Sequence, residues 1–457
     1  MIKESFRKYL EDAIGCENAL VAFSAFDEPA SVAVRYNPFK KATRMTGENV
    51  LWSRHGVLLG ERPVFTLDPC FHAGAYYVQD SSSMFVGDVF RRLLEEYELP
   101  QGRPLRVLDL CAAPGGKTTD LAASLREFCG DNFILVANEV MKQRAGILAS
   151  NIALWGDPNV VVTSDDPRDF TPFSGYFDII LADVPCSGEG MFRKDEQACE
   201  QWSEDNVALC EGRQRRILAD VWPSLTDKGL LVYSTCTFNR YENDGNVRWM
   251  SENLDGCPVF DSPTTPYEGV IATEFGFSLV PGFVKGEGQY CSAVRKQGVG
   301  KVDAEFRTYK NKSSKDKGVL IPDSLKKMFS IDVTFRQRGE TIIALPTSLV
   351  QDIAFLESGL NVIAAGCAAG TIKGKDFIPD ADLALSLILA SDAFPKAEVD
   401  KETALAYLHR DAIRLDDVQK GYVMVTYQEL PLGFVKNLGN RCNNLYPQSR
   451  RIRMNVR

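Results

Sequence analysis

Histidine is scarce in this chain of 457 residues, which contains only His55, His72 and His409. Acid–base chemistry near pH 7 is therefore expected to use carboxyl or thiol groups. No apolar run is long enough to cross a membrane, and no two of the 12 cysteines have the C-x-x-C spacing of a zinc site. The sequence predicts neither a membrane partner nor a metal.

Positive charge is also in the minority. The chain has 52 Lys and Arg against 61 Asp and Glu, a net charge of −9, which argues against a nucleic-acid partner for the chain as a whole. The last segment, GFVKNLGNRCNNLYPQSRRIRMNVR, is an exception because it contains basic residues and no acidic one. Asparagines and Tyr446 lie among these basic residues, which favours an RNA-binding surface over a solvated tail.

The first residues lack the apolar core of a secretory signal and instead predict an amphipathic helix over 1–14. We therefore expect a cytoplasmic protein with reduced thiols. A strand is predicted over 20–26 and another over 31–38. The basic cluster Arg35, Lys40, Lys41 and Arg44 suggests a role in gripping the substrate, although a small unit packed on the next domain is the simpler interpretation.

Strand-like and helix-like patterns alternate from 105 to 296. The apolar runs are RVLDL, FILVANE, NVVVTS, FDIILADVP and GLLVYSTC, and helical segments such as 142–156 separate them. This alternation predicts a doubly wound α/β fold, a Rossmann-like parallel sheet covered on both faces. Ligands of such sheets bind at the carboxyl ends of the strands.

The stretch RVLDLCAAPGGKTTD predicts a strand, a glycine turn and the start of a helix. A phosphate-loop interpretation fails because Cys111 stands where the first glycine of that loop is required. Glu139 lies about 20 residues beyond the turn, where a carboxylate binds the ribose hydroxyls of a cofactor. This position serves NAD and S-adenosylmethionine alike. Asp166, after the third strand, is placed to accept a hydrogen bond from an adenine amino group.

Two cysteines follow strands of the predicted sheet. Asp183-Val184-Pro185-Cys186 ends one apolar run, and Cys236 ends the next. Since successive strands are usually neighbours, both thiols and the Asp183 carboxyl group are expected to share one cleft. An isolated cysteine is usually a buried apolar residue, but two at adjacent strand ends favour a catalytic role.

Such a set suits methylation at C5 of cytosine, a weakly nucleophilic carbon. A thiolate that adds to C6 makes C5 electron-rich, and Asp183 could protonate N3. A base must then remove the C5 proton, and the second cysteine is a candidate. The residues alone do not say which cysteine is the nucleophile.

The segments DLCAAPGGKT, ADVPCSGEGMFRKD and YSTCTFNRYEN together resemble the RNA cytosine-5 methyltransferases of the NOL1/NOP2/Sun group. The C-terminal segments GTIKGKDFIPDADLAL and GFVKNLGNRCNNLYPQ resemble the bacterial branch that modifies 16S rRNA and ends in a PUA-like RNA-binding domain. Pro167 is a departure from the family, where glycine is common, and Asp165 is a possible substitute for Asp166. Gln289-Tyr290 replaces a common pair of aromatic residues.

The resemblance implies that Cys236 is the nucleophile and that Cys186 assists breakdown of the covalent adduct. Asp183, which the argument from the residues places at N3, is the third predicted catalytic residue. The resemblance also implies S-adenosylmethionine as cofactor, bound by residues of the glycine turn and the following strand ends: Cys111, Ala112, Ala113, Pro114, Gly115, Gly116, Lys117, Glu139, Arg144, Asp166 and Asp183.

We therefore predict an N-terminal RNA-docking segment (1–75), a methyltransferase domain (76–297), a linker (298–318), an intermediate α/β region (319–375) and a PUA-like domain (376–457). The predicted activity is methylation of C5 of a cytosine in RNA, with 16S rRNA or the 30S subunit as partner. The alternatives are the same chemistry on tRNA, or an RNA-binding ribosome-assembly factor. The sequence does not determine the oligomeric state.

Overall fold

The computed structural model describes residues 3–265, 267–298, 323–374, 376–415 and 418–456. The predicted linker 298–318 therefore lies, apart from its first residue, outside the described residues. The chain begins with α1 (Glu4–Ile14) and α2 (Cys16–Ala25). A four-stranded sheet follows, in the order β2 (Gly47–Asn49), β3 (Gly56–Leu59), β1 (Val32–Tyr36), β4 (Tyr76–Val78).

The strand predicted over 20–26 is wrong, because this segment belongs to α2. Ala19, Ala22 and Ala25 are buried at intervals of three residues, whereas Leu20 and Val21 are exposed. Small residues at this spacing let one face of a helix approach its neighbour closely, and α2 packs against α1. The predictions of a helix over 1–14 and a strand over 31–38 are confirmed by α1 and β1.

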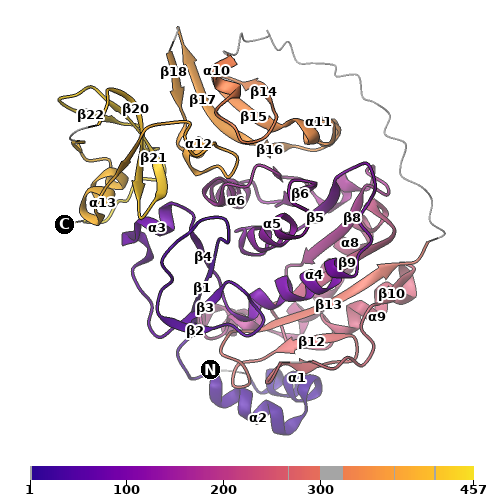
Figure 1. Cartoon of the computed structure of the whole chain (residues 1–457). Helices are drawn as coiled ribbons and strands as arrows, with labels where there is room; N and C mark the ends of the chain where they lie inside the picture. Colours follow the sequence, from indigo (N-terminus) through magenta and orange to yellow (C-terminus); the bar gives the residue numbers. More distant parts are fainter. Residues whose placement is uncertain (1–2, 266, 299–322, 375, 416–417, 457) are drawn as a thin grey trace.

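A ten-stranded sheet forms the centre of the molecule (Figure 1). Its order is β11-β12-β13-β9-β8-β5-β6-β7-β16, with β10 paired to β13. The parallel strands are β5 (Leu105–Asp109), β6 (Phe133–Asn138), β7 (Val160–Thr163), β8 (Phe177–Asp183) and β9 (Leu225–Thr235). The chain builds outward from β5 to β7, then crosses to β8 on the other side of β5. This reversal places the crevice of a doubly wound sheet at the carboxyl ends of β5 and β8.

The remaining strands of this sheet are antiparallel to their neighbours. They are β10 (Gly256–Pro258), β11 (Ile271–Ala272), β12 (Gly276–Leu279) and β13 (Gln289–Lys296) beyond β9, and β16 (Val362–Ala364) beyond β7. In β13, Gln289 donates from Nε2 to the Thr235 carbonyl at 2.9 Å, directly before Cys236. The pair that departs from the family pattern thus helps to hold the end of β9.

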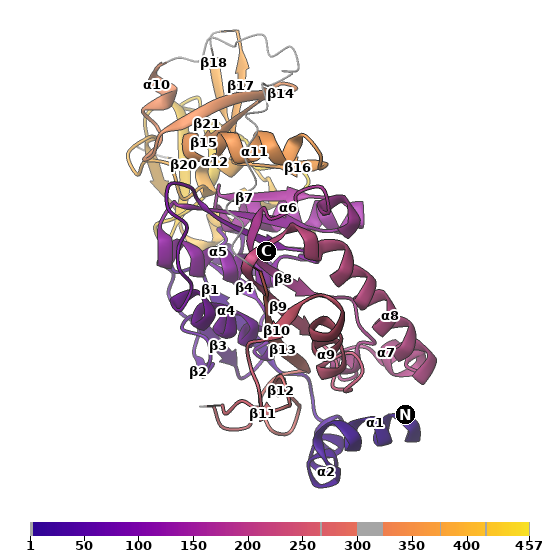
Figure 2. The same ribbon diagram turned by 90° about the vertical axis from the view of Figure 1, so that its right-hand side faces the viewer.

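Helices cover both faces of the central sheet (Figure 2). One face packs on α4 (Phe85–Glu95), α5 (Gly116–Cys129) and α6 (Lys142–Trp155). The other packs on α8 (Glu204–Val221), α9 (Asp244–Asn253) and α11 (Val350–Glu357). Within β5, Leu105 and Val107 join the first core while Leu108 joins the second. Two-sided burial of this kind is what near-continuous apolar runs predict for a parallel sheet.

The helix α11 comes from the predicted intermediate region, not from the methyltransferase segment. Between β7 and β8 the described chain has only a short 3-10 turn, Pro167–Phe170, and α11 covers the sheet face that a longer crossover helix would cover. A buried ion pair, Arg106 Nε to Asp352 Oδ1 at 2.8 Å, fastens α11 to β5. The strand β16 extends the same sheet next to β7.

The C-terminal part contains two further four-stranded sheets. The first has the order β14 (Val333–Arg338), β15 (Thr341–Pro346), β17 (Cys367–Lys373), β18 (Asp376–Pro379). The second has the order β19 (Lys396–Glu398), β20 (Gly421–Tyr427), β21 (Leu430–Asn437), β22 (Cys442–Asn444). The other α-helices of the described chain are short. They are α3 (Pro69–His72), α7 (Glu196–Gln201), α10 (Asp323–Lys326), α12 (Ala381–Leu385) and α13 (Lys401–His409).

The second C-terminal sheet packs against the N-terminal sheet. One core cluster contains Val34 and Tyr36 of β1 together with Leu405 of α13 and Val423 of β20. In the described part of the chain, no helix is both long and apolar enough to span a bilayer. Within the same residues, no three His, Cys, Asp or Glu side chains are grouped to hold a metal ion.

Candidate active site

The glycine turn follows β5 and leads into α5. Gly115 has φ of +112°, a left-handed conformation that a residue with a side chain rarely adopts, and Gly116 is the first residue of α5. The first N–H groups of a helix have no partner within the helix, so the turn presents hydrogen-bond donors at the carboxyl edge of β5. The predicted strand–turn–helix is confirmed.

The residues between β5 and the turn form a compact wall. Ala112 and Ala113 are buried, and Ala112 N–H donates to the Asn138 carbonyl at the end of β6, at 2.8 Å. Burial raises the pKa of the Cys111 thiol, which therefore stays neutral. Pro114 is exposed at the tip. This wall offers a neutral surface beside the donors of the turn.

Glu139 lies directly after β6 and is buried. Its Oε2 is 2.9 Å from Arg144 Nη1, and its Oε1 accepts from Met141 N–H at 2.9 Å. Arg144 also donates to the Ala113 carbonyl at 2.8 Å, so the pair joins the glycine turn to the start of α6. The sequence argument overlooked Val140, which is 54% exposed beside this carboxylate. An exposed apolar residue directly after a strand-end acid is the signal that could have found it.

Asp166 caps the 3-10 turn after β7. Its Oδ1 accepts from Arg168 N–H at 3.2 Å and lies 3.6 Å from Arg216 Nη1 of α8. Asp165, the possible substitute, has both carboxylate oxygens 3.0 Å from the Asn361 N–H. Asp165 therefore anchors the segment that precedes β16, which leaves Asp166 as the candidate for an adenine contact.

Asp183 ends β8 and faces two donors. Its Oδ1 accepts from Ser234 Oγ at 2.6 Å, and its Oδ2 is 2.9 Å from Lys117 Nζ at the start of α5. Burial acts to lower the pKa of Lys117, but the charge and hydrogen bond of Asp183 outweigh it, so the pKa is raised and the ammonium is retained. The glycine turn and the cysteine-bearing strands thus meet through one ion pair.

The two thiols lie in contact. Because β8 and β9 are parallel neighbours with Asp183 opposite Ser234, the residues that follow them converge, and the Cys186 and Cys236 sulfur atoms are 3.2 Å apart. The hydrogen bond with Cys236, followed by burial, raises the pKa of the Cys186 thiol well above its usual value. The protonated form of the Cys186 thiol is therefore favoured.

The sequence argument missed two buried glutamates behind the thiols. Glu189 follows Cys186 in the β8 loop, and Glu242 follows Cys236 in the β9 loop. Glu189 Oε2 accepts from Phe238 N–H at 2.7 Å, and Glu242 Oε2 accepts from Ser187 N–H at 3.0 Å. Each loop thus binds the backbone of the other. Neither glutamate ends a strand, so the rule that found the cysteines does not find them.

The predicted role of the N-terminal basic cluster in gripping substrate does not fit Arg35 and Lys40, which are buried. Arg35 donates to Thr119 Oγ1 at 2.6 Å and to the Gly116 carbonyl at 3.1 Å, so it supports α5 from β1. Lys40 donates to the Leu154 carbonyl at 2.7 Å. Buried cations of this kind fasten the N-terminal sheet to the central domain, and only Lys41 and Arg44 of the cluster are exposed.

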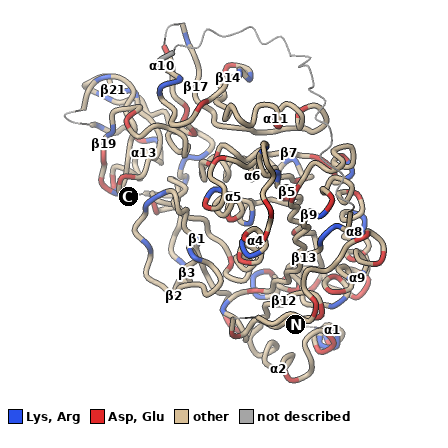
Figure 3. Tube along the Cα trace, turned by 45° about the vertical axis from the view of Figure 1, so that its right-hand side comes forward, with Lys and Arg blue, Asp and Glu red and all other residues tan. Residues whose placement is uncertain are grey.

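Some basic residues of the C-terminal segment are paired with acidic residues and are less available to bind RNA. Arg450 pairs with Asp382, and Lys436 Nζ is 2.6 Å from Asp376 Oδ2. Tyr446 is buried in the core shared with the N-terminal sheet, so its predicted place on an RNA surface is wrong. Arg451 and Arg453 are exposed. Figure 3 shows basic and acidic residues interspersed along the described chain.

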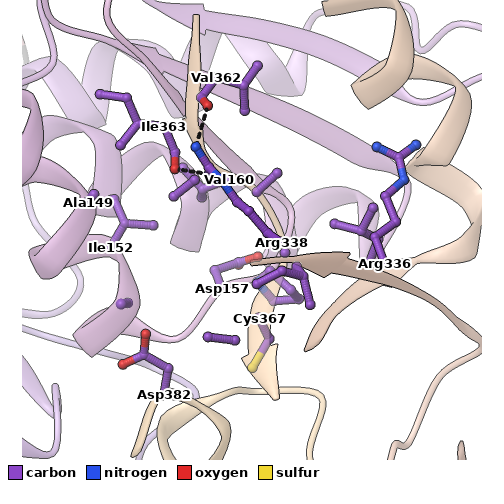
Figure 4. A pocket seen from close by; sticks show the side chains of 18 of the residues that line it. Ala149, Ile152, Asp157, Val160, Arg336, Arg338, Val362, Ile363, Cys367 and Asp382 are labelled. Atoms are coloured by element: carbon purple, nitrogen blue, oxygen red, sulfur yellow. Dashed lines mark hydrogen bonds between the residues drawn. The ribbon is translucent and has the colours of Figure 1, made fainter. Parts of the chain in front are cut away.

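A cavity of about 1070 Å³ lies away from the thiols, between α6 and the first C-terminal sheet (Figure 4). It is lined by Ala149 and Ile152 of α6 and by Arg336 and Arg338 of β14. Arg338 donates across one wall to the carbonyls of residues 362 and 363. Arg336 and Arg338 are thus engaged with α11 and β16, and none of the predicted catalytic or cofactor-binding residues lines the cavity.

The site differs from that of a dehydrogenase, because its glycine turn lacks the G-x-G-x-x-G pattern and its crevice holds a pair of thiols in contact. Activation of a pyrimidine by covalent attachment is a use for such a pair. Fold and site together define the class of Rossmann-like methyltransferases that act on RNA.

Comparisons with known proteins agree with this class. The family "16S rRNA methyltransferase RsmB/F" matches residues 99–295, the "N-terminal domain of 16S rRNA methyltransferase RsmF" matches 2–81, and the "Methyltransferase RsmF PUA domain" matches 394–452. The chain belongs to this family and is an S-adenosylmethionine-dependent RNA methyltransferase with a C-terminal PUA domain.

Two similar relatives are named "Ribosomal RNA small subunit methyltransferase F". That of Enterobacter sp. is 30% identical over 391 residues, and that of Pectobacterium atrosepticum is 29% identical over 396 residues. Each match covers 82% of this chain and 77% of the relative.

Solved structures share the fold. A methyltransferase homologue from Pyrococcus horikoshii aligns with a TM-score of 0.53 and 24% identity, covering 64% of this chain and 95% of that one. NSun6 from Pyrococcus horikoshii, solved with the S-adenosylmethionine analogue SFG, aligns with a TM-score of 0.51 and 21% identity, covering 65% and 98%.

Proposed function

We propose that this protein methylates C5 of a cytosine in 16S rRNA through a temporary covalent bond between the Cys236 sulfur and C6 of the base. The observation that carries the proposal is the 3.2 Å contact between Cys186 and Cys236 at the carboxyl ends of adjacent strands. Methylation of an exocyclic amine needs no thiol, whereas C5 chemistry needs one to form the adduct and a second group to help resolve it.

Cys236 is proposed as the nucleophile because the motif resemblance gives it that role, and the raised pKa of Cys186 favours a protonated thiol at the second position. The Cys236 thiolate adds to C6, the carbon–sulfur bond forms, and N3 takes up a proton. The cofactor supplies the methyl group that C5 then receives. Loss of the C5 proton to a base allows the carbon–sulfur bond to break, which releases the Cys236 thiolate, and N3 gives up the proton that it had taken. Cys186, already in hydrogen-bond contact with the departing sulfur, is proposed to assist this last step.

Asp183 is proposed to hold N3 of the base. Its carboxylate lies beside the Lys117 ammonium and the Ser234 hydroxyl, and it directly precedes the loop that carries Cys186. The Lys117–Asp183 pair keeps one proton at this point, which suits protonation of N3 as the sulfur adds to C6. The target base must leave its stack to reach these groups.

The cofactor is proposed to lie along the carboxyl ends of β5, β6 and β7. The donors of the glycine turn suit its polar amino-acid part, and the Glu139 carboxylate suits the ribose hydroxyls. Val140 offers an apolar surface for the adenine, and Asp166 an acceptor for its amino group. The remaining predicted contacts, from Cys111 to Lys117, with Arg144 and Asp183, surround this path.

The names of the relatives favour 16S rRNA over tRNA as substrate. A 16S rRNA substrate in turn suits a cytoplasmic enzyme. The thiols, the Lys117–Asp183 pair and the glycine turn are all assembled, which argues against a ribosome-assembly factor without activity.

Incubation of the purified protein with methyl-labelled S-adenosylmethionine and either 16S rRNA, 30S subunits or tRNA tests the proposal. Label is expected on C5 of cytosine in 16S rRNA or in the 30S subunit. Cys236→Ala is expected to abolish transfer while cofactor binding, measured by calorimetry, stays within about twofold, since the side chain is proposed to act only on the base. Turnover by Cys236→Ala, or label confined to tRNA, would contradict the proposal.

A further inference from the structure

Two carboxyl groups are buried behind the cysteine pair without a cation. Glu189 is 1% exposed and Glu242 less than 1%. Among the described residues, neither carboxyl group lies within 4 Å of a Lys, Arg or His nitrogen in any ion pair of the structure. Burial of an unpaired charge is costly, so neutral donors must hold these groups.

The donors come from three separate segments. Glu242 Oε2 accepts from Ser187 N–H at 3.0 Å and from Gln214 Nε2 of α8 at 2.7 Å, and its Oε1 accepts from Asn239 Nδ2 at 2.8 Å. Glu242 therefore binds the N–H that directly follows Cys186, from a position six residues beyond Cys236.

Glu189 makes the reciprocal connection. It accepts from Phe238 N–H at 2.7 Å and Asn239 N–H at 3.1 Å, and its other oxygen accepts from Trp202 Nε1 at 2.9 Å. The hydroxyls of Ser187 and Thr237 are also 3.0 Å apart. The two cysteine loops are thus joined in both directions, which fixes the distance between the sulfur atoms.

The two glutamates are not equivalent with respect to the thiols. Glu242 raises the pKa of Cys186, after the larger effects of Cys236 and burial, and also acts on Cys210 of α8 and Tyr233 of β9. Burial, followed by the charge of Glu189, raises the pKa of Glu242 to about 7. Glu242 is therefore anionic above about pH 7, and it is hydrogen-bonded to the N–H that directly follows Cys186.

We infer that Glu242 is a positioning residue that decides which of the two touching thiols acts as the nucleophile. It holds the backbone next to Cys186, and its negative charge disfavours a thiolate there, which leaves Cys236 to act as the nucleophile. Two thiols in contact cannot both lose their protons readily, and an anion bound to the N–H that directly follows Cys186 disfavours loss of the proton there. This inference rests on the proposed function but is measurable without turnover.

The test compares Glu242→Gln with Glu189→Gln. Both variants weaken the connection between the loops, but only Glu242→Gln removes the charge next to Cys186. The rate at which iodoacetamide alkylates Cys186 and Cys236 is followed against pH in the full-length protein, with each peptide quantified by mass spectrometry. Circular dichroism and thermal unfolding report whether each variant is folded.

We expect the pH midpoint for Cys186 alkylation to fall by about one unit in Glu242→Gln and to stay near wild type in Glu189→Gln. Equal midpoints in the two variants, or no change in either, would overturn the inference. Glu242→Asp keeps the charge on a shorter side chain and serves if Glu242→Gln does not fold. Its Cys186 midpoint should remain at the wild-type value, and a fall in that midpoint would reject a role for the charge.

Failure of the inference is distinguishable from failure of the proposed function. If Cys236→Ala retains methyl transfer, the proposed function is wrong whatever the alkylation midpoints are. If Cys236→Ala is inactive but Glu242→Gln and Glu189→Gln alkylate alike, the function stands and only the role of Glu242 is rejected.

Discussion

Individual residues acquire their roles here through contacts that their sequence neighbours do not reveal. Cys186 and Cys236 could be predicted because each follows an apolar strand, and the parallel pairing of β8 and β9 brings them together. Glu242 could not be predicted, because its donors Ser187 and Gln214 lie 55 and 28 residues away in sequence. The position of a residue at the end of a strand can be predicted from the sequence around it. Hydrogen bonds between two loops depend on the tertiary structure and cannot be predicted in this way.

For two basic residues, Arg35 and Lys40, the sequence suggested a role that the structure does not support. Arg35 and Lys40 looked like substrate contacts because Lys and Arg are usually exposed. In the structure both are buried, and Arg35 also lies over the Trp155 ring at 4.9 Å from its centre. A sequence gives the number of charges in a cluster, but the packing of two domains decides which of them face the solvent.

At the scale of elements, the C-terminus of α6 is held by the N-terminal sheet. Lys40 donates to the Leu154 carbonyl at 2.7 Å and Asn37 to the Trp155 carbonyl at 3.1 Å, which satisfies carbonyl groups that a helix end leaves without partners. Burial lowers the pKa of Lys40 to about 7. The connection between these two elements therefore depends on pH.

The sign of this dependence follows from proton binding. Unfolding returns the pKa of Lys40 to about 10.4, so between about pH 7 and pH 10 the unfolded chain binds more protons than the folded one. The free-energy cost of burying the charged Lys40 ammonium is fully present below about pH 7. This cost decreases as the pH rises through the range, so the protein becomes more stable.

We predict that the free energy of unfolding rises more between pH 7 and pH 9 in the wild type than in Lys40→Met, which has no titrating group at this position. Urea unfolding at the two pH values measures the difference. Lys41→Met, which removes the adjacent exposed lysine, is the matched control and should follow the wild type. Parallel behaviour of wild type and Lys40→Met would show that Lys40 keeps an ordinary pKa.

The elements of the central sheet were largely predictable, since the apolar runs coincide with β5, β6, β7, β8 and β9 and the alternation required crossovers between them. Two elements were not. The segment of α2 is apolar enough to resemble a strand, but its alanines pack at helical spacing in a core shared with α1 and with Phe192 and Trp202. The helix α11 covers the central sheet from beyond residue 345, which no local pattern could indicate.

At the scale of the whole molecule, the N-terminal and C-terminal sheets share one core, so the two predicted RNA-docking regions form a continuous part of the protein. Of the basic residues predicted to contact RNA, Arg450 and Lys436 are paired with aspartates, whereas Arg451 and Arg453 are exposed. Arg441 of the same segment is exposed as well, and the RNA contact of this region is therefore expected to depend on Arg441, Arg451 and Arg453.

We predict that Arg451→Glu/Arg453→Glu weakens binding to 16S rRNA by about tenfold or more at moderate salt and flattens its salt dependence, because fewer phosphates are neutralised. Filter binding over a series of salt concentrations measures both effects. Lys228→Glu/Arg295→Glu makes the same change in charge at the opposite, amino-terminal edge of the parallel sheet and should have little effect. Equal losses in the two variants would mean that net charge alone governs RNA binding.

The most direct test of covalent catalysis is to trap the adduct. Cys186→Ala, incubated with S-adenosylmethionine and 16S rRNA, should accumulate a protein–RNA species that survives denaturing electrophoresis and disappears in the double variant Cys186→Ala/Cys236→Ala. A stable species that persists without Cys236, or no such species while Cys236 is intact and methyl transfer continues, would contradict the division of labour between the two thiols.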